Sequence, residues 1–284
     1  METIERNFIP GGEWLFLKIY SGPKILENIL TDKIYPQIHS FIKNEWIDSF
    51  FFIRYTDPEY HIRLRFHSSN PKTLWEILIH LHPILSQLVQ TYMISNVVID
   101  TYSRELERYG ENNILYVERV FFHDSIFVCE FLSECPNADQ KRWTTCCLQI
   151  DSILNICDFS LADKINFCKE ASKLYNQEFF GDTHWGEKQW GLKYRQYRNE
   201  LNDILKLKII DTRILELLIE FSHNTSEYFK TIREKSEKQF FTSVLSSIIH
   251  MHINRMYRTK QRLNECAIYN LLLRFYQSNV YLPA

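Results

Sequence analysis

The sequence is poor in glycine and proline, with only 7 glycines and 8 prolines among 284 residues. Little of the chain therefore resembles a flexible linker or a low-complexity segment. A large excess of either charge is also missing, because 33 basic residues face 35 acidic ones and the formal net charge is −2. This balance argues against a broad nucleic-acid-binding surface, so any recognition of an anion has to be local.

Long hydrophobic runs are absent as well. No apolar stretch approaches the roughly 18 residues that a transmembrane helix needs, so we predict no membrane span. The beginning of the sequence, METIERNFIPGGEW, is acidic and polar, unlike a signal peptide. We therefore expect a cytoplasmic protein.

The cysteines lack a recognisable metal-binding pattern. There are 7 of them, an odd number, and no CxxC pair has zinc-like spacing. We expect reduced, mostly buried thiols, as is typical of cytosolic proteins, and neither a metal site nor another cofactor. Because five cysteines lie between Cys129 and Cys168, a soft-metal site there is the alternative.

Common catalytic signatures are missing too. The sequence has no P-loop, no GxGxxG after a strand, no HExxH and no GxSxG. These absences remove the usual nucleotide-binding, metalloprotease and serine-hydrolase interpretations, and the function has to be inferred from other groups of residues.

The first hundred residues alternate between strand-like and helix-like patterns. Strands are predicted at 13–20, 48–55, 61–67 and 95–102, with helical patterns at 22–44 and 70–90. The first helix should be interrupted near Pro36, and the second should begin with Asn70 as its cap and Pro71 in its first turn. The order strand–helix–strand–strand–helix–strand is typical of a ferredoxin-like split βαβ sheet.

From about residue 137 the strand signals fade and helical spacing dominates, with Asn137, Ser160 and Asp211 as candidate start caps. The predicted fold class is thus α+β, an N-terminal ferredoxin-like split βαβ sheet followed by a C-terminal helical bundle. The sheet half, residues 1–135, carries an arginine cluster, and the helical half, residues 136–284, carries a late histidine. No linker separates the halves, so we expect one integrated domain.

The stretch EYHIRLRFH, residues 59–67, places His61, Arg63, Arg65 and His67 on one face of the third strand. This strand is interior in the predicted sheet, so arginines on a covered face require carboxylates, a second domain or a ligand. Two guanidinium groups about 7 Å apart can clamp a carboxylate or a phosphate. The alternative is a set of ion pairs with acidic residues of the helical half.

A second group of charged residues follows the fourth strand in DTYSRELERYG, residues 100–110. If the segment is helical, Glu105 and Arg108 share a face, with Arg104 beside them. The alternative is a short turn that contains a salt bridge and ends at Gly110.

A third group lies in a late helix, SSIIHMHINRMY, residues 246–257. His250 and Asn254 stand four positions apart and share a face, whereas His252 points elsewhere. The alternative is a histidine whose hydrogen bonds are satisfied within the core.

Taken in order, FFIRYTDPEYHIRLRFH, TYSRELERYG, FHDS at 122–125 and HMHINRM resemble the C-terminal elimination domain of class I lanthipeptide dehydratases. This domain also occurs as separate thiopeptide-type bacteriocin biosynthesis proteins. The resemblance runs from about Glu13 to Phe275, and its specificity comes from the ordered set of motifs. It implies a reaction in which a partner transfers glutamate from glutamyl-tRNA onto Ser or Thr of a precursor peptide. The elimination domain then expels that glutamate and leaves dehydroalanine or dehydrobutyrine.

The resemblance also implies roles for individual residues. Arg63 and Arg65 match the arginines of the family's RLR strand and would hold the glutamyl carboxylates or the enolate charge. Arg108 matches the arginine of ExxRYG, although Gly110-Glu111 replaces the usual double glycine. His250 matches the histidine of HMxxNR and is the predicted proton-transfer group, with His252 as its rival. The predicted catalytic residues are Arg63, Arg65, Arg108 and His250, and the predicted substrate-binding residues are Glu105, Arg104, His61, His252 and Asn254.

The predicted function is a lyase that eliminates glutamate from glutamylated Ser or Thr. The chain is too short to include a glutamylation domain, so we expect a stand-alone version with a separate glutamyl-tRNA-dependent glutamylation protein as partner. The other expected partners are the precursor peptide and, as one possibility, a second copy in a homodimer. Two alternatives stay open: a thiopeptide-type [4+2] pyridine synthase that joins two dehydroalanines, and a non-catalytic peptide-binding subunit. We expect no direct binding of nucleic acid.

Overall fold

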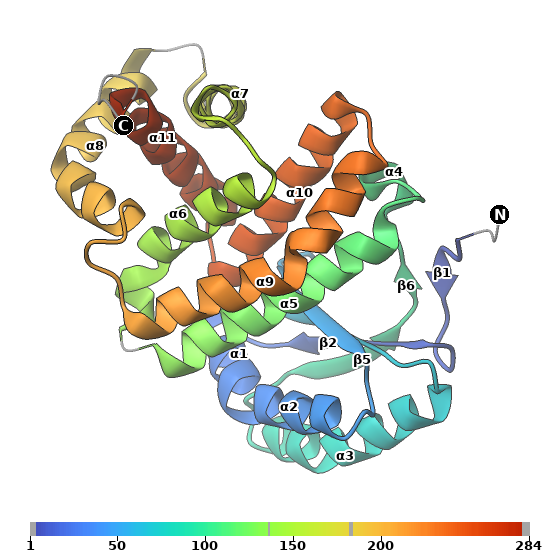
Figure 1. The fold of residues 1–284 in the computed structure, drawn as a ribbon. Coiled ribbons are helices and arrows are strands. Elements are labelled where there is room, and N and C mark those ends of the chain that lie inside the picture. Colours follow the sequence, from blue (N-terminus) through green and yellow to red (C-terminus); the bar gives the residue numbers. More distant parts are fainter. Residues whose placement is uncertain (1–3, 136, 182–183, 280–284) are drawn as a thin grey trace.

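The computed structural model describes residues 4–135, 137–181 and 184–279. Figure 1 shows a sheet with helices on both sides, and most of the later helices lie above it in this view. The strands are β1 (Asn7–Phe8), β2 (Trp14–Tyr20), β3 (Ser49–Tyr55), β4 (His61–His67), β5 (Asn96–Asp100) and β6 (Tyr102–Ser103).

The main sheet has the predicted ferredoxin-like topology. Its four strands run in the order β3-β4-β2-β5, and each neighbouring pair is antiparallel. Strand β4 is therefore interior, as predicted, between β3 and β2. The short pair β1–β6 forms a second sheet that the sequence patterns did not predict.

One face of the main sheet packs on helices from the first ninety residues (Figure 1). These are α1 (Pro23–Ile29), the π-helix η1 (Leu30–Ile34), α2 (Tyr35–Lys43) and α3 (Pro71–Gln90). The predicted interruption near Pro36 is this π-helical turn, in which the Tyr35 amide bonds to the Leu30 carbonyl five residues back. Proline has no amide hydrogen and its ring clashes with the preceding turn, which explains why regular helix fails there. The Asn70 side chain caps α3, as predicted.

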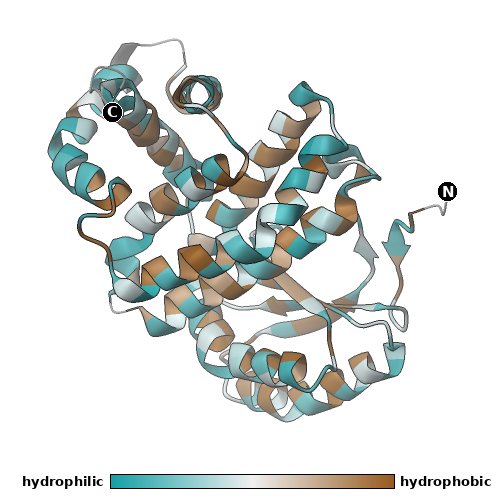
Figure 2. Ribbon diagram, in the orientation of Figure 1, coloured by the Kyte–Doolittle hydropathy of each residue, from teal (hydrophilic) through white to brown (hydrophobic). Residues whose placement is uncertain are grey.

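The rest of the chain is helical. Its elements are α4 (Leu106–Tyr109), α5 (Ile114–Glu134), α6 (Ala138–Ile156), α7 (Leu161–Phe180), α8 (His184–Leu205), α9 (Thr212–Glu234), α10 (Lys238–Met256) and α11 (Gln261–Asn279). In Figure 2 hydrophobic and hydrophilic residues alternate along most of these ribbons, as expected for helices with one buried side. The α+β fold class is thus confirmed.

Two of the three predicted start caps of this half are confirmed. Ser160 and Asp163 form a reciprocal capping box at α7, and the Asp211 side chain accepts from the amides of Arg213 and Ile214 at α9. Asn137 does precede α6, but it has a left-handed backbone with φ 57° and its side chain makes no capping bond. In that conformation the side chain is not directed at the first free amides of the helix.

The open edge of β3 is the seam between the sheet and the helical half. The Phe52 amide donates to Ser125 Oγ of α5, and the Phe52 carbonyl accepts from Arg255 Nε of α10. Asn254 of α10 bonds through Oδ1 to the Arg54 amide and through Nδ2 to the Arg54 carbonyl. At Phe52 and Arg54, side chains thus take the place of a further strand, which fixes α10 against the sheet.

All seven cysteines are free and buried, as predicted. Burial raises the pKa of each of these thiols, for example that of Cys157 to about 12 and that of Cys135 to about 11. Within the described ranges, no helix is long and apolar enough to cross a membrane.

His123, in the FHDS segment, predicts a pH dependence of stability. Burial, with a smaller contribution from the charge of Arg119, lowers its pKa from 6.5 to about 4. The unfolded chain therefore binds a proton between these pH values that the folded protein does not bind. We expect stability to fall as the pH drops from 6.5 towards about 4, and His123→Gln to reduce this slope in thermal unfolding curves. The exposed His39→Gln is the control; equal slopes in both variants would contradict the assignment.

Candidate functional site

Arg65 is a buried arginine that forms no ion pair with any residue that the structure describes. Its residue is 7% exposed, and its guanidinium carbon lies 4.3 Å from the ring centre of Phe16, 5.1 Å from that of Phe51 and 4.9 Å from that of Tyr102. Its Nε and Nη1 atoms are buried and have no hydrogen-bond partner among the residues that the structure describes. Aromatic faces attract a guanidinium group but leave its N–H groups unsatisfied.

The surrounding charges do not neutralise Arg65. Burial lowers its pKa to about 10, and repulsion by Arg63 and Arg255 acts in the same direction, although Tyr102 and Glu105 oppose it. The side chain still carries its charge at neutral pH. A buried cation with unused donors is costly for the fold, and a bound anion would relieve that cost.

Arg63 occupies the more accessible end of the same face. Its guanidinium carbon lies 3.5 Å from the ring centre of Tyr55, and its Nε donates to Nε2 of His61 over 3.1 Å. His61 in turn bonds through Nδ1 to the Glu59 carbonyl, and its ring stacks on Tyr20. Neither Arg63 nor Arg65 forms an ion pair in the described part of the chain, so the ion-pair alternative is wrong for both.

Arg255 is a third arginine at this place, and the sequence patterns gave it no role. It is fully buried, bonds through Nη1 to Asp124 Oδ2 over 2.8 Å, and keeps Nη2 without a partner among the described residues. Asp124 also accepts from Nδ1 of His252 over 2.7 Å. Burial alone would raise the pKa of Asp124, but the charges and hydrogen bonds of these two neighbours hold it below its usual value. Arg255 is the last charged residue of HMHINRM, so this motif could have identified Arg255 as a candidate site residue.

The charges of arginines from separate elements act together on Tyr109. Its pKa rises to about 12, chiefly through burial, and among the charges acting on it are Arg108, Arg255 and Arg65. Arg108 itself pairs with Glu105 over 3.2 Å across the short helix α4, which ends at Gly110 with φ 80°. The salt-bridged turn is thus confirmed.

Two predicted binding residues are already occupied by the fold. Arg104 bonds through Nε and Nη2 to the two carboxylate oxygens of Glu118, each over 2.7 Å, and through Nη1 to the Glu5 carbonyl. Asn254 uses both of its polar atoms on β3. Their hydrogen-bonding groups position the chain, and a role in substrate binding stays a prediction for both.

His250 forms a dyad with a buried carboxylate. Its Nδ1–H donates to Glu265 Oε2 of α11 over 2.7 Å, and its side chain is 21% exposed while that of Glu265 is 1% exposed. The bond fixes the ring so that Nε2 is the atom left to exchange a proton. His252 has the same kind of partner, but its side chain is 0% exposed. Accessibility therefore favours His250 of the two.

Within the described ranges, no hydrogen bond or ion pair links His250 to Arg63, Arg65 or Arg108. His250 and Arg255 lie five positions apart on α10, about 7.5 Å along the helix axis, and they point to different sides of it. Asn254 and Arg255 fix α10 on β3, and His250 lies on the same helix one turn before Asn254, so a shared pocket for His250 and the arginines stays a prediction.

The comparisons with known proteins decide the family. The family model for the lantibiotic biosynthesis dehydratase C-terminal region matches residues 14–276. The chain belongs to this family. The resemblance predicted from the motifs is thereby confirmed.

Relatives with curated names agree with this family. The chain is 27% identical over 281 residues to the nisin biosynthesis protein NisB of Lactococcus lactis subsp. lactis, which covers 98% of this chain and 27% of NisB. It is 24% identical over 262 residues to the subtilin biosynthesis protein SpaB of Bacillus subtilis, which covers 91% of this chain and 25% of SpaB. The chain thus spans about a quarter of the length of these family members.

Solved structures agree with the fold. The tRNA-dependent lantibiotic dehydratase MibB from Microbispora sp. 107891 matches with a TM-score of 0.73 at 17% identity, over 95% of this chain and 28% of MibB. TbtD, a pyridine synthase from thiomuracin biosynthesis, matches with a TM-score of 0.60 at 11% identity, over 94% of this chain and 100% of TbtD. At identities of 17% and 11%, these structural matches show that the fold is shared and nothing more.

Proposed function

We propose that this protein is a lyase that eliminates glutamate from glutamylated Ser or Thr residues of a precursor peptide. The observation that carries the proposal is Arg65, a charged side chain in an aromatic enclosure with unused N–H donors and no carboxylate partner. Natural proteins rarely bury such a group without a ligand. A glutamylated peptide supplies what the site lacks, because negative charge develops on it during elimination.

The reaction requires a base, a cation near the carbonyl oxygen of the modified residue and a cation near the leaving group. A base removes the Cα proton of the modified residue, and the electron pair of that C–H bond becomes the Cα=Cβ double bond. The Cβ–O bond breaks, and glutamate leaves as a free carboxylate. Negative charge grows first on the adjacent carbonyl oxygen and then on the leaving group, so fixed cations near both positions lower the barrier.

The arginines supply the cations for this scheme. Arg65 and Arg255 each have an unused buried N–H group, and these donors suit the enolate oxygen or the departing carboxylate. Arg63 and Arg108 are more exposed and suit the charged groups of the glutamyl moiety. These assignments rest on the charge and burial of each arginine, and replacing each arginine tests its assignment.

His250 is the proposed base. Its Nδ1 is held by Glu265, which leaves Nε2 as the accessible lone pair that takes the Cα proton. A carboxylate behind the imidazole also stabilises the imidazolium that forms. The glutamyl group would come from a separate glutamyl-tRNA-dependent protein, which we propose as the partner.

The direct test is mass spectrometry of a synthetic glutamyl-serine peptide incubated with the pure protein. We expect the loss of one glutamic acid and the appearance of dehydroalanine. His250→Ala should slow this loss by about 10²- to 10⁴-fold, the range for removal of a general base. The exposed His39→Ala is the matched control and should react at the wild-type rate. Persistence of the glutamylated peptide with the wild-type protein would overturn the proposal.

A pyridine synthase is the second candidate function. The observation in its favour is that the chain covers the whole of the TbtD structure. It predicts that a peptide with two dehydroalanines is cyclised whereas a glutamylated peptide is left unchanged. Binding of both peptides without any reaction would instead indicate a non-catalytic peptide-binding subunit.

A further inference from the structure

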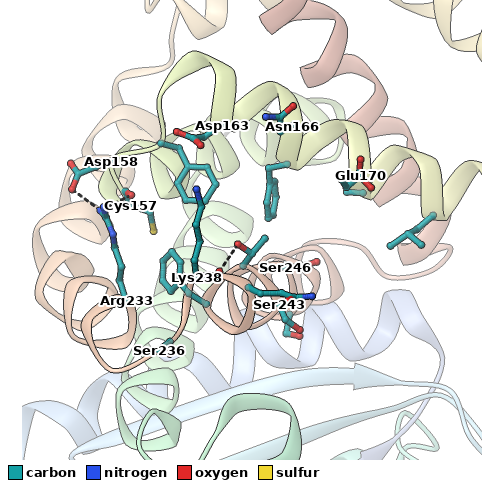
Figure 3. A pocket seen from close by; sticks show the side chains of 18 residues that line it. Cys157, Asp158, Asp163, Asn166, Glu170, Arg233, Ser236, Lys238, Ser243 and Ser246 are labelled. Carbon is teal, nitrogen blue, oxygen red and sulfur yellow. Dashed lines mark hydrogen bonds and ion pairs between the residues drawn. The ribbon is translucent and has the colours of Figure 1, made fainter.

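A cavity between α7 and α10 lies outside the arginine cluster. Its volume is about 870 Å³, and α7 faces the first half of α10 across it (Figure 3). This volume is in the range of pockets that enclose a drug-sized ligand. Nothing in the proposed elimination chemistry uses it.

The lining of this cavity suits a peptide. From α7 it receives Asp163, Asn166 and Glu170, and from α10 it receives Lys238 and several hydroxyl groups, as Figure 3 shows. Carboxamides and hydroxyls can both donate to and accept from the amides of an extended chain. The aromatic residues Phe159, Phe167 and Phe241 provide apolar surface for side chains.

The charges inside the cavity are only partly used. Arg233 and Asp158 pair over 3.0 Å and close one end, as Figure 3 shows. Glu170 and Lys238 form no ion pair or hydrogen bond through their side chains in the described ranges. Glu170 stands at the end away from Arg233 and Asp158 (Figure 3), so a cationic side chain of a bound peptide would find an unpaired carboxylate there.

The end of the cavity lined by Leu174 and Ser247 is the end closer in the chain to the proposed base. Leu174 lines it, and the next residue, Tyr175, lies beside Glu265, whose carboxylate together with burial raises the pKa of the Tyr175 hydroxyl. Ser247 also lines the cavity and precedes His250 by three positions, so the two lie on one side of α10. On both walls, the lining thus comes within one helical turn of residues that belong to the His250–Glu265 dyad or lie beside it.

We propose that this cavity, the α7–α10 groove, binds the stretch of precursor peptide next to the glutamylated residue and prefers a lysine or arginine there, held by Glu170. The inference rests on the proposed function for the identity of the peptide. It makes the groove a specificity site that decides which Ser or Thr is presented to His250.

The test compares two probes with the wild-type protein and with Glu170→Lys. One probe is a capped glutamyl-serine amide, which is too short to enter the groove, and the other is a longer glutamyl-serine peptide with flanking lysines. Glu170→Lys should raise KM about tenfold for the long probe at unchanged kcat, and leave the short probe unaffected. A long probe with flanking glutamates should show the opposite preference. The exposed Glu76→Lys on α3 is the control for charge.

A second measurement does not depend on catalysis. Fluorescence anisotropy of the unmodified serine peptide with flanking lysines should show binding to the wild type, and weaker binding to Glu170→Lys and to Ser243→Phe, which fills the groove. Equal affinity for all three proteins would overturn the groove assignment even if elimination proceeds. Loss of binding in the variants without any turnover by the wild type would support the groove and overturn the lyase function.

Discussion

Replacing Arg65 by methionine is expected to slow elimination strongly and to leave the protein at least as stable as the wild type. The turnover of a glutamyl-serine peptide should fall by about 10²- to 10³-fold, the usual cost of removing one donor from a developing oxyanion. Stability should stay unchanged or increase, because methionine fills the same aromatic enclosure without an unsatisfied buried charge. Peptide mass spectrometry and thermal unfolding measure the two effects.

Arg104→Met provides the matched contrast. Arg104 is about as buried as Arg65, at 6% against 7% exposure, but it holds Glu118 through two hydrogen bonds. Its loss leaves a buried carboxylate unpaired and should cost about 3–5 kcal/mol of stability. If Arg65→Met destabilises the protein as much as Arg104→Met, Arg65 has a structural partner and the anion site is not there.

The contrast between these arginines explains which part of the site could be predicted from sequence. The period-two pattern of HIRLRFH is a local property, and it correctly placed Arg63 and Arg65 on one face of an interior strand. Whether a carboxylate meets them depends on helices more than fifty residues away. Sequence spacing carries no information about such contacts, so the ion-pair alternative could be removed only by the structure.

The same limit applies to α5 and α10. Helix α5 is rich in aromatic and β-branched residues and is buried on several sides, so a one-sided periodic pattern is weak and it was not predicted. Asp124 of α5 links His252 and Arg255 of α10, a connection between residues 128 and 131 positions apart in the chain. A role for Arg255 in the site could have been suspected from its motif. That its Nη2 has no partner among the described residues could not be predicted from the sequence.

The halves of the chain are also joined by a buried network around Glu27 of α1. Its Oε2 accepts from Arg54 of β3 over 3.0 Å, and its Oε1 accepts from Arg142 of α6 over 2.7 Å and from Arg258, which follows α10, over 3.1 Å. Glu27 is 4% exposed. Arg142 and Arg258 share Asp139 as a second carboxylate, whereas Arg54 has Glu27 alone. Burial lowers the pKa of Arg54 to about 10, and the charge of Glu27 acts against this effect. The buried charge of Arg54 is therefore balanced by Glu27.

Glu27→Ala should therefore destabilise the protein by about 3–5 kcal/mol, because it leaves Arg54 buried and unpaired between the sheet and the helices. If the chain folds as one integrated domain, as the sequence predicts, guanidinium unfolding followed by fluorescence should stay a single transition with a lower midpoint. Glu107→Gln, which removes an exposed pair with Arg6, should leave the midpoint unchanged. Two separate transitions, with only one shifted by Glu27→Ala, would show that the halves unfold independently and that the network does not couple the arginine strand to α10.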